Sequence, residues 1–321
     1  MIKKWILLSG LAFCIACNDQ KSSGIPVVGF ADAFQDNTIE QAKTGFMDAL
    51  RENGFDEKKG TLKIIYRNAQ GNIPTLTQII RYFVSQKVTL IATNPSLSTI
   101  TAVQNTKDIP IFMMVSPTPA LMKINDSSGR PPSNLFGVGE TLDYIDTSFL
   151  LIPKVVKTKT GVITVGMIFN QSEPQSVESM ERIRKLAEGN HINLISLPVN
   201  STADVQLVTA SLLSKNIDVF FANPDNIVFE SFETIIQACN QKNIPVFTSE
   251  AGLVERGALA AYGADIYQWG YQTGQEAAIY LKTKSTASLH WEMVKVRKKV
   301  YNPAASKKFN LSIPSNFEPV Q

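Results

Sequence analysis

The strongest constraint on the fold is an alternation that begins at Gly24. Short apolar segments rich in β-branched residues alternate with segments whose apolar residues recur at helical spacing. This pattern predicts strand–helix–strand units, which join parallel strands by right-handed crossovers. Strands are expected at residues 27–31, 62–69, 88–93 and 109–115 in the first half, and at residues 162–169, 192–199, 217–222, 245–248 and 258–262 in the second. The two groups of strands predict two Rossmann-like α/β lobes with parallel sheets.

Helices are expected between these strands. Residues 38–53 carry an apolar stripe on one face, begin with a Thr38/Gln41 capping pair and end at Gly54. Further helices are expected at residues 76–84, 174–188, 203–215, 227–242 and 266–283. Their stripes indicate packing on a core rather than cofactor binding.

The lobe boundary is expected in a polar, Pro- and Gly-bearing stretch at residues 116–133 and in the segment 135–139 that follows it. The predicted first lobe comprises residues 25–138 and 263–285, and the second comprises residues 139–262 and 286–321. Hinge segments are expected near residues 137–139, 262–263 and 284–290.

Composition excludes several classes of function. The 321 residues are 44% hydrophobic and 18% charged, which is an ordinary balance for a globular chain with two cores. A formal net charge of +3 is too small for a nucleic-acid groove. With two histidines and three cysteines, the chain has few ligands for a zinc site. We therefore expect no metal, no cofactor and no nucleic-acid partner.

The N-terminal segment is typical of an export signal. Residues 1–16 combine two lysines with an apolar run that is too short for a membrane span. The run ends in Ala16 and Cys17, which resembles a bacterial lipobox in which Cys17 receives the lipid. Residues 17–24 then form a polar tether, and the protein is expected on the extracytoplasmic side of the cell envelope. The open alternative is a plainly secreted protein with a free N-terminal cysteine.

Candidate site residues follow the predicted strands. Ligands of open parallel sheets bind beyond the carboxyl ends of the strands, and these positions are unusually polar here. They include Asn68, Gln70, Asn94, Ser96, Ser116, Asn170, Ser172, Glu173, Asp225 and Asn226. Singly, such residues are ordinary helix caps, but as a group they predict a polar cleft.

No catalytic motif is present. The chain lacks a GxSxG elbow, a P-loop, an HExxH helix and a GxGxxG turn. Neither His191 nor His290 follows a predicted strand beside a serine or cysteine that it could activate. The acidic candidates Glu173, Asp225 and Glu250 could act as an acid–base pair or bind a ligand ammonium without reaction. Binding requires fewer assumptions, so we expect no enzyme.

Several short segments occur in one order along the chain. They are GFMDAL at 45–50, RNAQG at 67–71, KDIPI at 107–111, NQSE at 170–173, PDN at 224–226, IPVF at 244–247, GALAAYG at 257–263, and residues 302–314. Together they resemble the substrate-binding lipoproteins of ABC transporters whose members take up tryptophan or tyrosine. The resemblance covers nearly the whole mature chain.

This resemblance implies a type I periplasmic binding fold, in which two lobes close on a small ligand about a multi-segment hinge. The resemblance implies that each lobe lines the ligand site with polar residues. These would be, in the first lobe, Asn68, Gln70, Asn94, Ser96 and Ser116, and in the second lobe, Asn170, Ser172, Glu173, Ser176, Asp225, Asn226 and Glu250. Asp225 is the first choice and Glu250 the second for pairing with a ligand amine. Serine hydroxyls and backbone amides at helix N-termini would meet a carboxylate.

One departure concerns the ligand side chain. Where the family tends to show a histidine–proline pair, this chain has Asp36 and Asn37. Phe30, Phe34 and Tyr262 could stack on an aromatic or aliphatic group, or could belong to the core.

The resemblance therefore implies a solute-binding lipoprotein of an importer. It would capture a small polar ligand, such as an aromatic or other apolar amino acid, and deliver it to an ABC permease and its ATPase. The alternatives are an extracytoplasmic sensing module and a hydrolase or lyase that uses Asp225 and Glu173. A DNA-binding regulator with the same lobes would need an N-terminal helix-turn-helix, where this chain has a signal segment.

Overall fold

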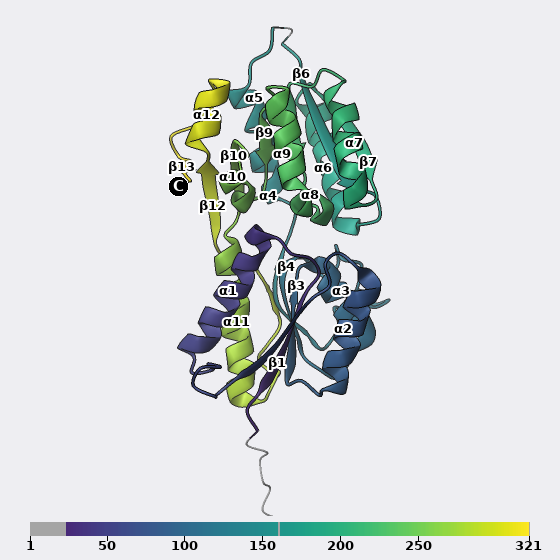
Figure 1. Cartoon of the computed structure of the whole chain (residues 1–321), viewed down its shortest axis with the longest axis vertical. Helices are drawn as coiled ribbons and strands as arrows, with labels where there is room; N and C mark the ends of the chain where they lie inside the picture. Colours follow the sequence, from purple (N-terminus) through teal and green to yellow (C-terminus); the bar gives the residue numbers. More distant parts are fainter. Residues whose placement is uncertain (1–23, 160, 321) are drawn as a thin grey trace, which may run out of the picture.

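The structure is a computed structural model that describes residues 24–159 and 161–320. It has two α/β lobes, one above the other in Figure 1. The predicted signal peptide and Cys17, together with nearly all of the tether, lie outside the described residues. The α/β class and the two parallel-sheet lobes are confirmed.

The first lobe holds a six-stranded parallel sheet in the order β11-β5-β4-β3-β1-β2. Its strands are β1 (Val27–Asp32), β2 (Lys63–Asn68), β3 (Leu90–Asn94), β4 (Ile111–Pro117), β5 (Leu135–Glu140) and β11 (Trp291–Met293). Two pairs of helices cover its two faces (Figure 1): α1 (Asn37–Glu52) with α11 (Ile266–Thr283), and α2 (Ile73–Ser85) with α3 (Ser96–Asn105). The helix pairs bury the apolar side chains of both sheet faces.

Helices α1 and α11 pack unusually closely. A Cβ atom at Gly45 would collide with the backbone of Tyr267, and one at Gly270 would collide with the backbone of Ala42. Glycine at these positions lets the two helix backbones approach each other. This contact brings a C-terminal helix onto the first sheet, and so joins the two halves of the sequence in one lobe.

The second lobe holds a four-stranded parallel sheet in the order β7-β6-β8-β9 and a three-stranded sheet in the order β10-β12-β13. The strands are β6 (Ile163–Asn170), β7 (Ile192–Val199), β8 (Val219–Ala222), β9 (Val246–Thr248), β10 (Ala260–Ala264), β12 (Arg297–Tyr301) and β13 (Glu318–Pro319). The helices are α4 (Tyr144–Phe149), α5 (Ile152–Val155), α6 (Pro174–Gly189), α7 (Thr202–Leu213), α8 (Asn226–Glu230), α9 (Phe232–Gln241), α10 (Ala251–Glu255) and α12 (Pro303–Phe309).

The nine strands expected from the sequence are present, and their ends differ from the expected ones by at most two residues. Three local predictions are wrong. Residues 135–139 form the buried strand β5 rather than a linker. The helix expected at 227–242 is broken at Ser231 into α8 and α9. Asp36 rather than Thr38 caps α1, because its carboxylate accepts the backbone N–H groups of Thr38 and Ile39.

The predicted lobe boundaries also need correction. Strand β11 lies in the first sheet, where it pairs with β5, whereas residues 286–321 were expected in the second lobe. The edge of β5 offers unpaired backbone groups that this short strand satisfies. The chain thus crosses between the lobes after β5, between β10 and α11, and between β11 and β12. The expected hinge at 284–290 leads from α11 to β11 and stays within the first lobe.

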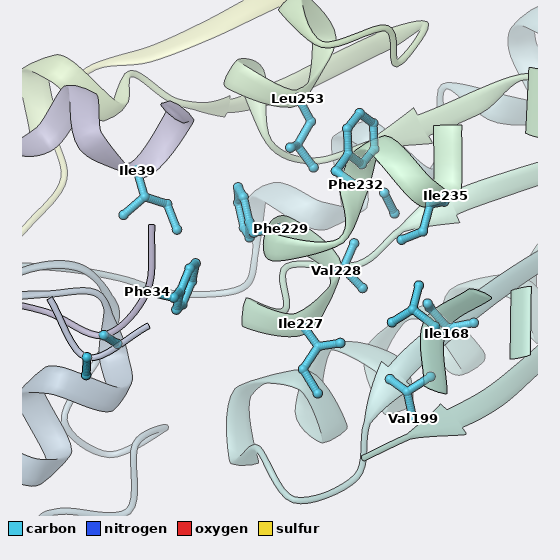
Figure 2. Close-up of a cluster of buried hydrophobic side chains, with 14 of the residues drawn as sticks. Phe34, Ile39, Ile168, Val199, Ile227, Val228, Phe229, Phe232, Ile235 and Leu253 are labelled. Carbon is cyan, nitrogen blue, oxygen red and sulfur yellow. The ribbon is translucent and has the colours of Figure 1, made fainter. Parts of the chain in front are cut away.

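A hydrophobic cluster spans the two lobes. Phe34 and Ile39 of the first lobe face Phe229 and Leu253 of the second in Figure 2, and all four side chains are buried. The lobes of this structure are therefore closed on each other.

Candidate functional site

A small cavity lies between the lobes. Its volume is about 40 Å³, and both lobes contribute to its wall. The apolar part of the wall includes Ile39, Pro95, Val115, Leu142, Phe229 and Trp269. The polar part includes Ser116, Glu140, Tyr144, Gln175, Asn226 and Glu250. An amphipathic ligand suits such a wall.

Glu250 is the acidic group of the wall without a cationic partner. Its carboxylate accepts the hydroxyl of Tyr144 at 2.7 Å and that of Ser249 at 3.4 Å. Burial raises the pKa of Glu250 to about 7. Within residues 24–159 and 161–320, no lysine or arginine forms an ion pair with this carboxylate.

Glu140 is different, because Arg297 compensates its charge. The guanidinium donates to both carboxylate oxygens, at 2.5 Å and 3.2 Å. Burial of Glu140 raises its pKa, although Arg297 works in the opposite direction. Glu250 is therefore the carboxylate best placed to receive a cation from a ligand.

A hydrogen-bonded group joins the lobes beside the cavity. The amide of Asn226 in the second lobe donates to the hydroxyl of Ser96 in the first at 3.1 Å, and also to the carboxylate of Glu173. Ser96 in turn donates to Glu173 at 3.3 Å. Burial and the neighbouring Asp225 raise the pKa of Glu173. The two bonds of Ser96, with Asn226 and with Glu173, can form only when the lobes are closed.

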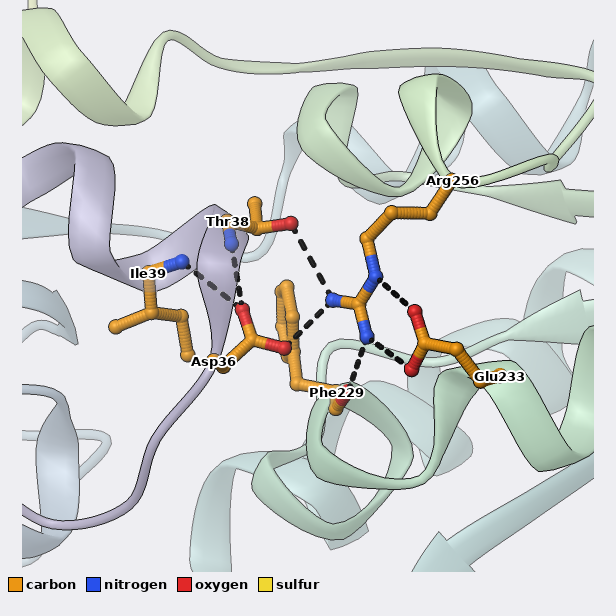
Figure 3. A network of polar contacts seen from close by, with 6 residues as sticks. All are labelled: Asp36, Thr38, Ile39, Phe229, Glu233 and Arg256. Atoms are coloured by element: carbon orange, nitrogen blue, oxygen red, sulfur yellow. Dashed lines mark hydrogen bonds and ion pairs between the residues drawn. The ribbon is translucent and has the colours of Figure 1, made fainter.

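A second link lies at Arg256, next to α10 (Figure 3). Its guanidinium contacts the carboxylate of Asp36 in the first lobe at 2.6 Å and the Thr38 hydroxyl at 3.3 Å. The same side chain donates to both oxygens of Glu233, at 2.9 Å and 2.8 Å, and to the carbonyl of Phe229 at 3.0 Å. A planar guanidinium can satisfy all these acceptors at once.

The structure brings together only part of the predicted site. Ser116, Asn226 and Glu250 line the cavity, and Ser96 and Glu173 lie in the group beside it. Asn94 is fully buried and donates to Asp32 at 2.8 Å. Asn68 is the half-buried last residue of β2, and its side chain accepts the backbone amide of the exposed Gln70.

Asp225 was the first choice for a ligand amine, but the structure gives its carboxylate another role. One oxygen accepts the backbone amides of Ile227 and Val228 and so caps α8. The other accepts the amide of Asn170 at 2.6 Å and the hydroxyl of Ser176 at 2.5 Å. With four donors, this carboxylate is fully used within the second lobe. Neither it nor Asn170 nor Ser176 lines the cavity.

The predicted aromatic residues also lie away from the cavity wall. Phe30 is buried in the first lobe, in an edge-to-face contact with Phe46. Tyr262 packs on the core of the second lobe, and Phe34 belongs to the cluster between the lobes. Ser172 is exposed and donates its backbone amide to Asn170. For Phe30 and Tyr262, the core interpretation is the one that the structure supports.

Sequence reasoning missed Glu140, Leu142, Tyr144 and Trp269. Glu140 ends β5, and Leu142 and Tyr144 follow it; the segment was interpreted as a linker, so its carboxyl end was not inspected. Trp269 lies in the first turn of α11, directly after the second crossing. These residues could therefore have been found from the places where the chain crosses between the lobes, but not from their residue types.

Comparison with known proteins places this geometry in a family. A sequence model described as ABC transporter substrate binding protein matches residues 28–318. The chain belongs to this family. ABC transporter substrate-binding proteins are transport components without enzymatic activity, so the acid–base alternative is wrong. The expected small-ligand binding and extracytoplasmic location follow from the same membership.

Similarity to individual proteins supports the same family membership. The Tyrosine-binding protein of Clostridioides difficile (strain R20291) is 31% identical over 263 residues, which are 82% of this chain and 74% of that protein. A conserved domain protein of Vibrio cholerae O1 biovar El Tor superposes with a TM-score of 0.82 at 28% identity, over 93% of this chain and 100% of that one.

Two further structures share the fold. An ABC domain from Streptococcus pneumoniae in complex with L-Trp has a TM-score of 0.83 at 20% identity, over 93% and 100% of the two chains. The ligand-free, open structure of a substrate-binding protein with adhesive properties from Clostridium difficile has a TM-score of 0.66 at 27% identity, over 92% and 99%.

Two kinds of feature are absent from the described residues. None of their helices combines the length and apolar character that a membrane span requires. Between residue 24 and residue 320, with residue 160 left aside, no three His, Cys, Asp or Glu side chains gather as a metal-binding group would.

Proposed function

We propose that this protein captures an amino acid with an apolar side chain between its lobes and delivers it to the permease and ATPase of an ABC importer. The observation that carries this proposal is Glu250, a buried carboxylate in the wall of an otherwise largely apolar cavity between two lobes, which pairs with no cationic side chain among the residues that the structure describes. A ligand ammonium would supply the missing charge.

The rest of the wall supports the same ligand class. Trp269 and Phe229 offer apolar surface to a side chain. The hydroxyl of Ser116 donates to the carbonyl of Met114 at 3.1 Å and contacts the hydroxyl of Thr99 at 3.2 Å, and by rotating it can donate to a ligand carboxylate instead. The names of two relatives, which mention tyrosine and L-Trp, support an aromatic amino acid as the first ligand to test.

The closed arrangement supports capture by lobe motion. A cavity of about 40 Å³ is far smaller than the several hundred Å³ of typical ligand pockets, so the lobes must part to admit an amino acid. The lower TM-score against the relative in its open structure is consistent with a difference in lobe spacing. Hinge motion at the three crossings would permit the opening.

Attachment to the membrane completes the proposal. Cys17 would be acylated after cleavage at Ala16, and the polar residues up to Gly24 would separate the lobes from the bilayer. This part rests on the sequence, because residues 1–23 lie outside the described residues.

Native mass spectrometry and thermal unfolding of residues 24–321, purified without refolding, test the binding step. We expect a co-purified amino acid, and a rise in Tm with one or a few members of the twenty L-amino acids, because a ligand that binds only the native state stabilises it. Deaminated analogues of the same ligands are the control, and we expect them to have little effect. A full panel without any shift contradicts the proposal.

Uptake of the radiolabelled ligand by cells with and without the gene tests delivery. Deletion should abolish high-affinity uptake, and expression of the full chain should restore it. Uptake that continues unchanged while binding persists would instead favour the sensing alternative.

A further inference from the structure

The backbone of Val115 is unusual. Its φ is +48°, in the left-handed region that β-branched residues avoid. The side chain is half-buried, and Val115 lines the cavity between the lobes. It packs against the hydrophobic cluster that contains Ile39 and Phe229, and also against the one that contains Trp269. A strained residue therefore lies between the apolar walls of the site.

A bulge in β4 accounts for this conformation. Met113 pairs with Gly137 of β5, but the next pair is Ser116 with Gly139, so two residues of β4 oppose one residue of β5. Such an extra residue bends a strand and redirects a side chain. Gly137 itself has a φ of +94°, and a Cβ atom there would collide with the backbone of Met113. Only glycine fits opposite the start of the bulge.

Helix α11 holds the bulge in place with three side chains from one face. The indole N–H of Trp269 donates to the carbonyl of Val138 at 2.8 Å. The hydroxyl of Thr273 donates to the carbonyl of Met113 at 3.1 Å, and the carboxyl of Glu276 accepts the amide of Gly137 at 2.9 Å. Residues spaced by four and three positions share a helix face. Backbone strain persists where such surrounding contacts fix it.

We propose that Val115 determines which ligands the site accepts, because the bulge positions it as the size limit for the ligand's apolar group. This inference rests on the proposed function and assigns one residue to its selectivity. The strain at Val115 is then the consequence of directing a branched side chain into the cavity. In a hydrophobic pocket, one methylene changes discrimination by about 10- to 200-fold.

The variants V115A and V115G test the proposal, with V28A as a matched control. Val28 is a fully buried valine of the same sheet and does not line the cavity. Calorimetric titration with L-leucine, L-tyrosine and L-tryptophan gives the ratio of their Kd values for each variant. We expect V115A and V115G to shift this ratio toward L-tryptophan by about tenfold or more, and V28A to leave it unchanged.

Thermal unfolding without ligand gives a second, independent readout. Because glycine adopts a positive φ freely whereas alanine does not, V115G should melt no lower than V115A. A lower Tm for V115G, or an unchanged ratio of Kd values in a wild-type protein that binds the panel, overturns the role of Val115. If the wild-type protein binds none of the three amino acids, both the selectivity role of Val115 and the proposed aromatic or aliphatic ligand are wrong. This failure would be seen with the wild type, before any variant is made.

Discussion

The carboxylate of Asp36 lies 2.6 Å from the guanidinium of Arg256, and this ion pair joins the start of α1 in the first lobe to the end of α10 in the second. The side chain of Asp36 is 1% exposed and that of Arg256 is 15% exposed. The pair is thus shielded from water, and its energy depends on the lobes staying together.

Arg256→Met should shift the ligand-free protein toward an open form. Loss of a charged hydrogen bond costs about 1.5–3 kcal/mol, and most of this cost falls on the closed state. The radius of gyration without ligand should rise, and the apparent Kd should increase by about 10- to 100-fold, because ligand binding must then supply the energy of closure. Small-angle scattering and calorimetry measure the two effects.

Arg182→Met is the matched control. Arg182 binds Asp146 with two hydrogen bonds at 2.5 and 2.8 Å, and it also pairs with Asp143, all within the second lobe. This variant should lose stability without any change in lobe opening. Equal scattering curves for the two variants would contradict a role for Arg256 in closure.

Glu250→Gln should weaken binding of an amine-bearing ligand by about 10- to 100-fold, the equivalent of about 1.4–3 kcal/mol. The amide keeps an acceptor for the Tyr144 hydroxyl but removes the negative charge. The deaminated ligand should bind wild type and variant equally weakly. If the wild type also binds the deaminated ligand more tightly than E250Q does, Glu250 is not the partner of the ligand amine.

The same residue predicts a pH dependence of binding. The pKa of Glu250 is raised to about 7 by burial, so the carboxyl loses its proton between about pH 6 and 8. Since an ammonium binds the ionised form, affinity should rise with pH across this interval. The E250Q variant should show a flatter profile, which titration at several pH values will measure.

Asp225→Asn should destabilise the fold more than it weakens binding. The asparagine oxygen can still cap α8, but its NH2 group then faces the amide of Asn170, which keeps only the hydroxyl of Ser176 as an acceptor, at 3.0 Å. Loss of a hydrogen bond to a charged group costs about 1.5–3 kcal/mol. Urea unfolding should show this loss, whereas the Kd of the folded variant should change less than in E250Q. If D225N instead raised the Kd more than E250Q did, Asp225 would again be the candidate partner of the ligand amine.

Glu276→Gln should change how stability depends on pH. Burial and the nearby Glu292 raise the pKa of Glu276 to about 8, whereas the hydrogen bond from the Gly137 amide and, less strongly, Lys295 act in the opposite direction. Because its folded pKa lies above the ordinary value of 4.5, its contribution to stability is present below about pH 4.5 and is lost as pH rises toward 8. The free energy of unfolding of the variant should therefore rise relative to that of the wild type as the pH increases across that interval. The slope is about 1.4 kcal/mol per pH unit, so the gain reaches a few kcal/mol. Parallel unfolding curves at pH 5 and pH 8 would exclude this effect.

The order of strands and helices was predictable because it depends on local periodicity. The nine expected strands occur, and α11 begins and ends where its pattern predicts. Strand β5 was missed because its apolar run is short and contains two glycines, which resemble a hinge. Strand β11 was missed because it consists of only three residues, and its pairing partner is more than 150 positions away.

The residues of the cavity wall were predictable only as a class. Glu250 was expected as an acidic group of the predicted cleft. Parallel sheets place strand ends at a cleft, and this rule found Ser116 and Asn226. It could not separate them from Asp225, because a carboxylate that caps a helix and one that faces a ligand have the same sequence surroundings. Hydrogen bonds from Asn170 and Ser176 decided between the two roles.

The sequence by itself determined the alternation of strands and helices and the family resemblance, since each depends on residues close together in the chain. Only the tertiary structure decided which side chains meet across the lobes. Val115 acquires its position from a glycine on a neighbouring strand and from three side chains of α11, and Asp36 acquires its partner from Arg256, more than 200 residues away. Such contacts depend on packing in three dimensions, which no local pattern specifies.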